Sequence, residues 1–325
     1  MINTKLKIDH VHIKVSDLEN SIQFYRSILG FKLVKQESKT VFLSSSNTNS
    51  SLFLIALTEL KDVLKPQRKQ RVAGLYHFAI LLPERRHLAY FLKNIQKNLS
   101  PEYYEGMADH AVSESIYIHD PDFNGIEIYT DRPPSEWKWK DNTVHMVTEP
   151  LNVQDLMKES ILAVENEWNE LPPNTSIGHI HLHVSNLAKA KKFYDEILGL
   201  NHTATFPGAY FFAANRYHHH IATNTWLGEN ISHAIKDNNR VGLDHYAINL
   251  QSQNDLLLLK NRLLEFKIGI DEHIVEIENK KSPSFYTYDF DSIKIQFCIT
   301  ITKNSELNKS ISYKFQPKLL LLWKL

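Results

Sequence analysis

The chain repeats itself. The segment IDHVHIKVSDLENSIQFYRSILGF at 8–31 recurs as IGHIHLHVSNLAKAKKFYDEILGL at 177–200, with 11 of 24 positions identical. GLYHFAILL at 74–82 recurs as GLDHYAINL at 242–250, and DPDFNGIE at 120–127 aligns less closely with DFDSIKIQ at 289–296. The spacing between the copies is nearly constant, so the second half is expected to fold into the same unit as the first.

Each half divides further into two smaller units that begin with a strand rich in β-branched residues. Helices are expected to end near Gly30 and Gly199, where glycine stops a helix. Two more helices are expected at 84–98 and 252–265, and short strand-like runs follow each helix. The pattern predicts an α+β fold of four β-α-β-β-β modules. Their ranges are 8–60, 74–130, 177–226 and 242–299.

The repeat also predicts domain boundaries. With roughly 100–200 residues per domain, a chain of 325 residues suits two domains. Residues 1–133 are expected to pair the first two modules in one domain, and residues 177–300 to pair the last two. A linker at 134–176 is expected to carry a helix near 152–167. No role is assigned to the extension at 301–325.

Composition excludes several classes of partner. Lys+Arg and Asp+Glu are both 37, so no basic excess points to nucleic acid or to an anionic membrane. The single cysteine, Cys298, rules out a disulfide framework and a cysteine zinc cluster. The apolar run at 319–323 is far shorter than the roughly 20 residues that span a bilayer. The chain is therefore expected to be cytoplasmic.

Alternation of side chains along the strands places potential ligands on one face. His10 and His12 share a face of the first strand, His77 lies on the first strand of the second module, and Glu127 lies on its last strand. Two histidines and one carboxylate that leave coordination positions open are typical of non-heme Fe(II) oxygenases. The first half therefore predicts a metal site of His10, His77 and Glu127.

Four runs carry a family resemblance: DHVHIKVSDL at 9–18, GLYHFAI at 74–80, the long run at 109–133, and RYHHHIATNTW at 216–226. With them the chain resembles the vicinal oxygen chelate superfamily of glyoxalase I, bleomycin-resistance proteins and type I extradiol dioxygenases. It is most similar to the two-domain catechol 2,3-dioxygenase-like proteins of Gram-positive bacteria. The resemblance implies two tandem open barrels, each curled from a pair of modules around a metal.

The resemblance also implies roles for individual residues. In two-domain extradiol enzymes the second half normally holds the metal, and its equivalent positions here are His179, His245 and Gln296. Gln296 replaces the carboxylate, and the ligand charge favours the first half. His219 resembles the acid/base histidine of these enzymes, which has no counterpart in SSLFLIAL at 50–57, so each half is incomplete in a different way. The remaining expected site residues are Tyr117 and His110 for catalysis, and His12, Tyr286 and His181 for substrate binding.

The implied function is a metal-dependent extradiol dioxygenase, an oxidoreductase that cleaves catechol-like aromatics with dioxygen. Fe(II) is the favoured metal, with Mn(II), Ni(II) and Zn(II) as alternatives. A protein that sequesters an aromatic toxin or antibiotic without chemistry is one rival. A glyoxalase-type lyase or isomerase is another, although the second carboxylate it would need is absent from 51–57 and 218–226. The substrate, the metal, the half that holds the site and the formation of a homo-oligomer are left open.

Overall fold

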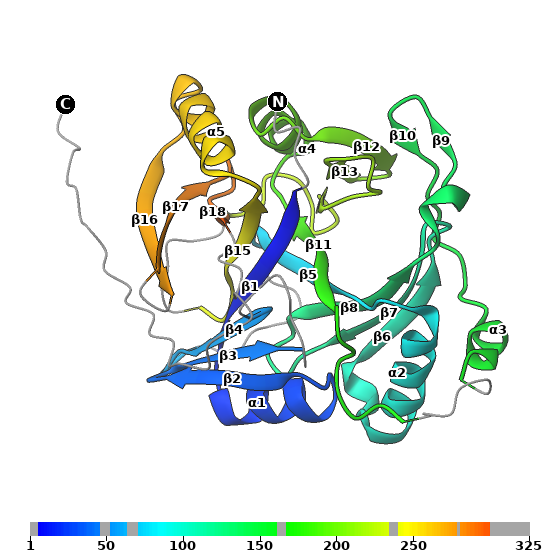
Figure 1. Ribbon diagram of the computed structural model, residues 1–325. Coiled ribbons are helices and arrows are strands. Elements are labelled where there is room, and N and C mark those ends of the chain that lie inside the picture. The colour runs from blue at the N-terminus through cyan, green and yellow to red at the C-terminus, as the bar shows by residue number, and fades with distance from the viewer. Residues whose placement is uncertain are drawn as a thin grey trace.

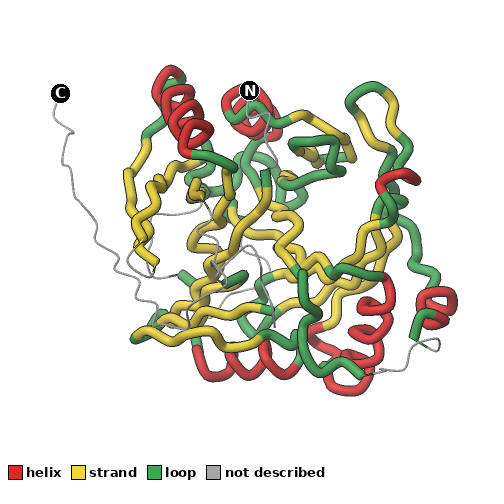
Figure 2. Tube along the Cα trace, in the orientation of Figure 1, coloured by secondary structure: helices red, strands yellow, loops and turns green. Residues whose placement is uncertain are grey.

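The computed structural model describes residues 6–45, 53–63, 71–160, 167–233, 240–277 and 280–299. Four β-α-β-β-β modules follow one another along the chain, which confirms the predicted α+β class (Figure 1). Figure 2 shows the helices on the outside of the molecule, with the strands between them. No helix among the described residues is long and apolar enough to cross a bilayer. The extension at 301–325 lies outside the described residues.

The elements of the four modules are as follows. The first module contains β1 (Lys7–Val15), α1 (Leu18–Ser27), β2 (Lys32–Glu37), β3 (Thr40–Ser44) and β4 (Ile55–Glu59). The second contains β5 (Gly74–Leu81), α2 (Arg85–Asn98), η1 (Pro101–Tyr103), β6 (Tyr104–Asp109), β7 (Ser113–His119) and β8 (Gly125–Asp131). The third contains β11 (Ser176–His183), α4 (Leu187–Lys191), η3 (Lys192–Ile197), β12 (Asn201–Phe206), β13 (Ala209–Ala213) and β14 (Ile221–Asn224). The fourth contains β15 (Gly242–Leu250), α5 (Gln253–Glu265), β16 (Ile270–Ile277), β17 (Lys280–Tyr288) and β18 (Lys294–Ile299).

The segment between the halves carries η2 (Pro134–Glu136), the short strands β9 (Trp139–Lys140) and β10 (Thr143–Val144), and α3 (Val153–Lys158). The linker helix expected at 152–167 is therefore present in its first part. Residues 161–166 lie outside the described residues.

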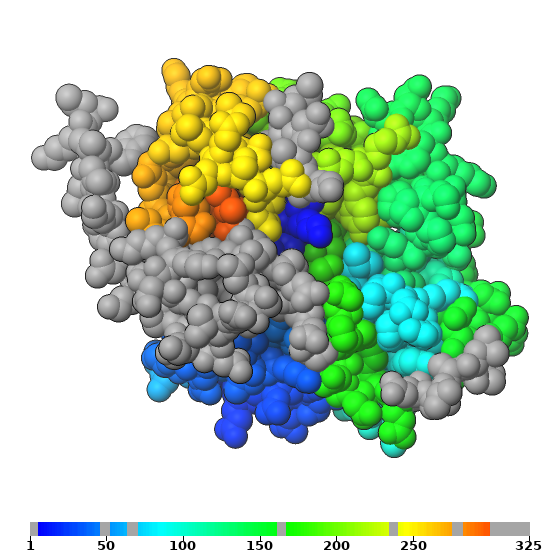
Figure 3. Space-filling model, in the orientation of Figure 1, coloured from blue at the N-terminus to red at the C-terminus, as the bar shows by residue number. Residues whose placement is uncertain are grey.

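The strands form two eight-stranded sheets, and each sheet takes one module from each half. The first and fourth modules form the order β16-β17-β18-β15-β1-β4-β3-β2, and the second and third form β12-β13-β14-β11-β5-β8-β7-β6. The first of these sheets lies on the left of Figure 1 and the second on the right. Figure 3 shows the same division, with blue and yellow-to-orange surface on the left and cyan and green on the right.

This pairing corrects the predicted domains, which placed successive modules together in 1–133 and 177–300. The first strands pair across the halves instead: β1 runs antiparallel to β15, and β5 antiparallel to β11. The sequence could not decide this, because the first strand of every module carries the same alternating pattern. A local pattern fixes which face is buried but not which distant strand is the neighbour.

Successive modules are tied together away from the sheet hydrogen bonds, and the tie is duplicated. The carboxylate of Asp122 accepts hydrogen bonds from the backbone N–H of Ser16 at 2.7 Å and from its hydroxyl at 2.5 Å. At the equivalent position in the second half, the backbone N–H of Ser185 donates to Asp291 at 3.0 Å. The predicted repeat is thus preserved in its polar contacts as well as in its strands.

The predicted helices form where the sequence places them. α1 begins at an Asp17 cap whose side chain accepts from the N–H of Asn20 at 2.9 Å, and Ser252 caps α5 in the same way. Gly30 adopts φ +83°, and a Cβ there would lie 2.8 Å from the backbone N of Leu171. The aliphatic faces of the first strands pack against these helices, which leaves the histidine faces turned toward the inner side of each sheet.

Candidate metal centre

Three potential metal ligands converge on the inner face of the sheet formed by the second and third modules. Ala79 on β5 is directly opposite Glu127 on β8 and directly opposite His179 on β11. His77 is two residues before Ala79 and therefore points to the same face. Because Ala79 is small and fully buried, the three larger side chains can approach one another above it.

The ligand atoms are close and shielded from solvent. Nε2 of His77 lies 3.0 Å from Oε2 of Glu127, and Nε2 of His179 lies 2.9 Å from the same oxygen. The three residues are 5%, 3% and 1% exposed. Ser115 on β7 donates a hydrogen bond of 2.5 Å to Oε1 of Glu127, which fixes the orientation of the carboxylate.

The protonation states suit a divalent cation. Burial lowers the pKa of His179 to about 4, although Glu127 acts in the opposite direction, so the imidazole is neutral near pH 7. Burial alone would raise the pKa of Glu127, but the adjacent His179, which hydrogen-bonds to it, and the nearby His77 hold it well below its usual value. Metal ions require a neutral imidazole and an ionised carboxylate.

An unsatisfied atom supports the same assignment. Nε2 of His77 is buried and has no hydrogen-bond partner of acceptable geometry, even though it lies close to Glu127. A buried polar atom without a partner is costly in a native protein and calls for an explanation such as a bound ion. Two imidazoles and one carboxylate in this arrangement fit Fe(II) or a similar divalent metal.

The predicted ligand sets are regrouped by the sheet pairing. Of the set His10, His77 and Glu127, the structure brings together the last two and puts His10 in the other sheet, 5.6 Å from His245 between ring centroids. The alternative set is divided as well, since His179 lies in one sheet while His245 and Gln296 lie in the other. Each predicted set assumed that one half supplies all its own ligands, whereas the centre takes His77 and Glu127 from the first half and His179 from the second.

The other sheet carries a different cluster of potential ligands, in which only His245 is the repeat counterpart of a ligand of the centre. A cluster of His12, Asp244 and His245 is present there, with Oδ1 of Asp244 2.6 Å from Nδ1 of His245. Lys294 lies 3.7 Å from that carboxylate, and its ammonium sits 4.3 Å from the ring centroid of Tyr286. Lys294 aligns with Gly125 in the repeat, so this sheet has a cationic side chain at a position where the sheet of the second and third modules has no side chain. That positive charge opposes binding of a metal ion at this cluster.

A cavity of about 300 Å³ opens beside the His77–Glu127–His179 centre. This volume is at the small end of the range for ligand sites, which suits a compact single-ring molecule. Its walls come from the second and third modules and from the linker. The apolar lining consists of Ala108, Val112, Ile118, Ile126, Met146, Phe206, Phe211 and Trp226. The polar lining includes His77, Glu105, His110, Tyr117, Glu127, His181 and His219.

Tyr117 and His110 were predicted together and are found together on this cavity. Nδ1 of His110 lies 2.7 Å from the carbonyl oxygen of Val147, which can only accept, so Nδ1 carries the proton. Nε2 of His110 then accepts the hydrogen bond of 2.7 Å from the Tyr117 hydroxyl. Burial, reinforced by Glu127, raises the pKa of Tyr117 well above its usual value, so the phenol remains protonated.

His219 also lines the cavity, and its ring contacts that of His179 at a tilt, with 4.1 Å between centroids. Its Nδ1 lies 2.8 Å from Nδ1 of His218, whose Nε2 lies 2.9 Å from Oδ1 of Asp131. Asp131 accepts from His218 Nε2–H, so Nδ1 of a neutral His218 accepts from His219 Nδ1–H. This chain of hydrogen bonds leaves the lone pair of His219 on Nε2, where it can take a proton.

The residues predicted to bind substrate divide between the sheets. His181 lines the cavity, and its Nε2 accepts from the Asn224 amide at 3.0 Å. His12 and Tyr286 lie in the other sheet, each beside His245, with centroid distances of 5.1 and 5.2 Å. They do not line this cavity because His12 belongs to the first module and Tyr286 to the fourth. These two modules form the other sheet.

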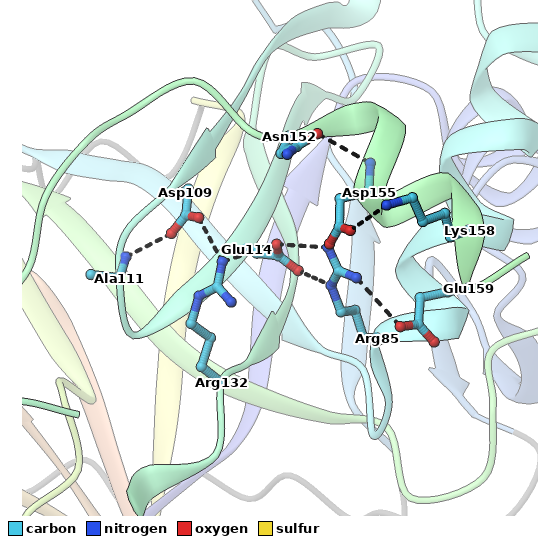
Figure 4. Close-up of polar contacts among 9 residues, drawn as sticks. All are labelled: Arg85, Asp109, Ala111, Glu114, Arg132, Asn152, Asp155, Lys158 and Glu159. Atoms are coloured by element: carbon cyan, nitrogen blue, oxygen red, sulfur yellow. Dashed lines mark hydrogen bonds and ion pairs between the residues drawn. The ribbon is translucent and has the colours of Figure 1, made fainter. Parts of the chain in front are cut away.

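A network of charged residues holds the linker against this cavity (Figure 4). Arg85 contacts the buried carboxylate of Glu114 at 2.5 and 3.0 Å and lies 3.0 Å from Asp155 on α3. Arg132 bonds to the same Glu114 at 3.1 Å and to Asp109 at 2.6 Å. Asp109 immediately precedes His110, so the network also restrains the segment that presents His110 to Tyr117.

Three site residues were missed in the sequence: Ser115, His218 and Asp131. Ser115 lies on the same strand face as Tyr117, and this alternation could have placed it beside Glu127. Strand alternation would put His218 on the face opposite His219, but both side chains are buried in the irregular segment before β14. The contact between His218 and Asp131 joins the two halves, so no pattern in the neighbouring sequence of either residue predicts it.

Comparison with known proteins defines the class. The sequence profile of the Glyoxalase/Bleomycin resistance protein/Dioxygenase superfamily matches residues 7–128 and 176–296, and the chain belongs to this superfamily. It is 38% identical over 274 residues to the catechol-2,3-dioxygenase of Bacillus subtilis strain 168, which covers 83% of this chain and 92% of the relative.

Solved structures share the fold. A Bacillus subtilis protein described provisionally as a dioxygenase superposes with a TM-score of 0.60 at 14% identity, over 90% of this chain and 84% of its own. Glyoxalase I from Zea mays superposes with a TM-score of 0.54 at 15% identity, over 91% and 92%. Both likenesses show the fold of two module pairs and carry nothing about activity.

Proposed function

We propose that this protein is a metal-dependent extradiol dioxygenase that cleaves catechol-like aromatics, and that His77, Glu127 and His179 hold an Fe(II) ion. The observation that carries the proposal is the convergence of these three buried ligands beside a small cavity that His219 and Tyr117 also line. The 38% identity to a catechol-2,3-dioxygenase over most of both chains supports it. A small aromatic substrate, dioxygen and a cytoplasmic location belong to the same proposal.

The bound metal would supply Lewis acidity that lowers the pKa of a catechol hydroxyl, with coordination positions left open for the substrates. The chain supplies the rest. His219, with its lone pair on Nε2, takes a proton from the substrate hydroxyl and later returns it. Tyr117, whose own proton is donated to His110, offers its oxygen as the acceptor for the second substrate hydroxyl. The apolar wall excludes water from the reacting ring.

The test uses the full chain, reconstituted with Fe(II) without oxygen and then assayed aerobically with catechol for oxygen uptake and yellow ring-opened product. Glu127→Ala should lose bound metal by elemental analysis and lose activity. Gln296→Ala is the matched control, because it changes the aligned position in the other sheet and should keep both.

Two results would overturn the proposal. If no catechol gives ring-opened product in protein with stoichiometric iron, the reaction is wrong. If Glu127→Ala keeps its metal while Gln296→Ala loses it, the centre lies in the other sheet. Tight binding of aromatics by protein that takes up no metal would favour a sequestering protein.

A further inference from the structure

The mouth of the cavity has an acidic and aromatic rim. Glu105 on β6 and Trp226 after β14 both line the cavity, and both are exposed to solvent, Trp226 by 50%. Residues that line a cavity and also reach solvent lie at its opening. Tyr76 lies between them: its ring is edge-on to the Trp226 indole at 5.4 Å. Burial and then the nearby Glu105 carboxylate raise the pKa of its phenol.

Among the described residues, the cavity wall carries two carboxylates and no side chain with a permanent positive charge. Glu105 and Glu127 line the cavity, and among the described lining residues there is no lysine or arginine. Arg71 lies near the rim, but its Nε donates to the carbonyl of Leu227 at 2.9 Å, and it does not line the cavity. Among the described lining residues, an anionic group at the mouth would therefore meet a carboxylate and no cationic lysine or arginine.

The apolar lining of the cavity indicates the path that a substituent on a catechol ring would follow. A catechol whose hydroxyls approach the His77–Glu127–His179 centre would place its ring in this cavity, whose apolar lining includes Phe211 and Ile118. A short ring side chain that extends away from the centre then passes along this apolar wall to the rim. The chemistry it meets there is the Glu105 carboxylate and the exposed face of Trp226, both of which attract a cation.

We propose that this cavity selects among catechols by the charge of a short ring side chain, and prefers an ammonium group over a neutral alkyl group and an alkyl group over a carboxylate. Glu105 is the residue that sets this order. The inference rests on the proposed ring-cleaving function for its chemistry, but the order of binding stands on the cavity alone.

Three catechols of similar size form the test: dopamine as the cation, 4-propylcatechol as the neutral probe, and 3,4-dihydroxyphenylacetate as the anion. The first readout is kcat/KM with Fe(II)-reconstituted protein. The second is binding of the same probes without oxygen, followed by quenching of tryptophan fluorescence. Each step of the order is expected to be about threefold to tenfold at low salt, since charges near the surface interact modestly, and to shrink at high salt.

The variants separate Glu105 from general surface charge. Glu105→Gln should bring the three probes within about threefold of one another, and Glu105→Lys should place the carboxylate probe first. Glu136→Gln is the control, because it removes an exposed carboxylate that does not line the cavity and should keep the wild-type order.

Each outcome decides one of the two proposals. If the anionic probe binds as well as the neutral one, or if Glu105→Gln keeps the wild-type order, the selection by Glu105 is overturned. If no probe is turned over while binding still follows the order, the ring-cleaving function fails and the selection survives.

Discussion

Asp131→Asn removes the charge at the far end of the chain of hydrogen bonds that leads to His219, and it does so with little change of shape. The asparagine oxygen can still accept from Nε2 of His218, which lies 2.9 Å from the native carboxylate. The tautomer that leaves a lone pair on Nε2 of His219 is then retained. What is lost is the attraction between the carboxylate and the positive charge that develops when His219 takes a proton.

The size of that attraction follows from the geometry. The path from Asp131 to His219 consists of contacts of 2.9 and 2.8 Å separated by one imidazole ring, which gives a charge separation of about 8 Å. At an effective dielectric constant of about 20, two unit charges at this distance attract by about 2 kcal/mol. The expected effect is a loss of about 30-fold in kcat, since each 1.36 kcal/mol in the barrier is tenfold.

The assay compares steady-state kinetics and metal content of the Fe(II)-reconstituted proteins with catechol. KM and bound iron should stay close to wild type, because Asp131 touches neither the cavity nor the ligands. Tyr217→Phe is the matched control: it removes the hydrogen bond of 2.9 Å to the other carboxylate oxygen and keeps the charge, so kcat should fall by less than about threefold.

A kcat for Asp131→Asn within twofold of wild type would refute the role given to this carboxylate. An equal loss in Asp131→Asn and Tyr217→Phe would refute it as well, because the contact would then be structural and not electrostatic.

Two further predictions concern stability. Glu114→Gln leaves the guanidinium groups of two arginines facing a neutral amide at a site where Glu114 is 2% exposed, so the free energy of unfolding should fall by about 3 kcal/mol in urea titrations. Glu159→Gln on the exposed side of the same network should change it by less than about 1 kcal/mol, and equal losses would contradict the importance of burial. Burial raises the pKa of Asp289 to about 7, so its contribution to stability is full below about pH 4 and is lost as the pH rises through 7. Unfolding measured from pH 5 to 8 should show a decline of up to about 1.4 kcal/mol per pH unit in wild type that is weaker in Asp289→Asn; parallel curves would contradict the assigned pKa.

The parts of the fold that depend on local pattern were predictable. α2 and α5 occur within a residue or two of the ranges expected from the sequence, and Gly30 terminates its helical segment at positive φ as expected. The pairing of modules was not predictable, since β1 and β5 carry the same alternation and either could lie beside any other first strand. Pairing is decided by contacts between residues that are 95 or more positions apart in the sequence.

The same distinction applies to the site. Strand alternation places His77 and Glu127 on one face, and in the structure their side chains lie 3.0 Å apart. The repeat identifies His179 as the counterpart of His10 in the second half. Which of His10 and His179 completes the centre depends only on the sheet pairing. Asp131 could not be found, because its partner lies 87 residues away in the other half.

The loss of different residues from the two halves is explained by this pairing. A centre built within one half would need both the carboxylate and the acid/base histidine in that half, and neither half has both: the first has Glu127, and the second has His219. With the second and third modules in one sheet, those two residues serve the same cavity, and nothing requires the first and fourth modules to retain a centre. Those modules carry Gln296 in place of the carboxylate and Lys294 in place of Gly125. Gly125 itself has no room for a side chain, because a Cβ added to it would lie 2.1 Å from the carbonyl oxygen of Tyr76. Lys294 supplies, in the sheet of the first and fourth modules, the positive charge that the proposed metal ion would supply in the other sheet, so the carboxylate of Asp244 has a cationic neighbour without a metal. One sheet thus carries the proposed centre, while both sheets join the two halves.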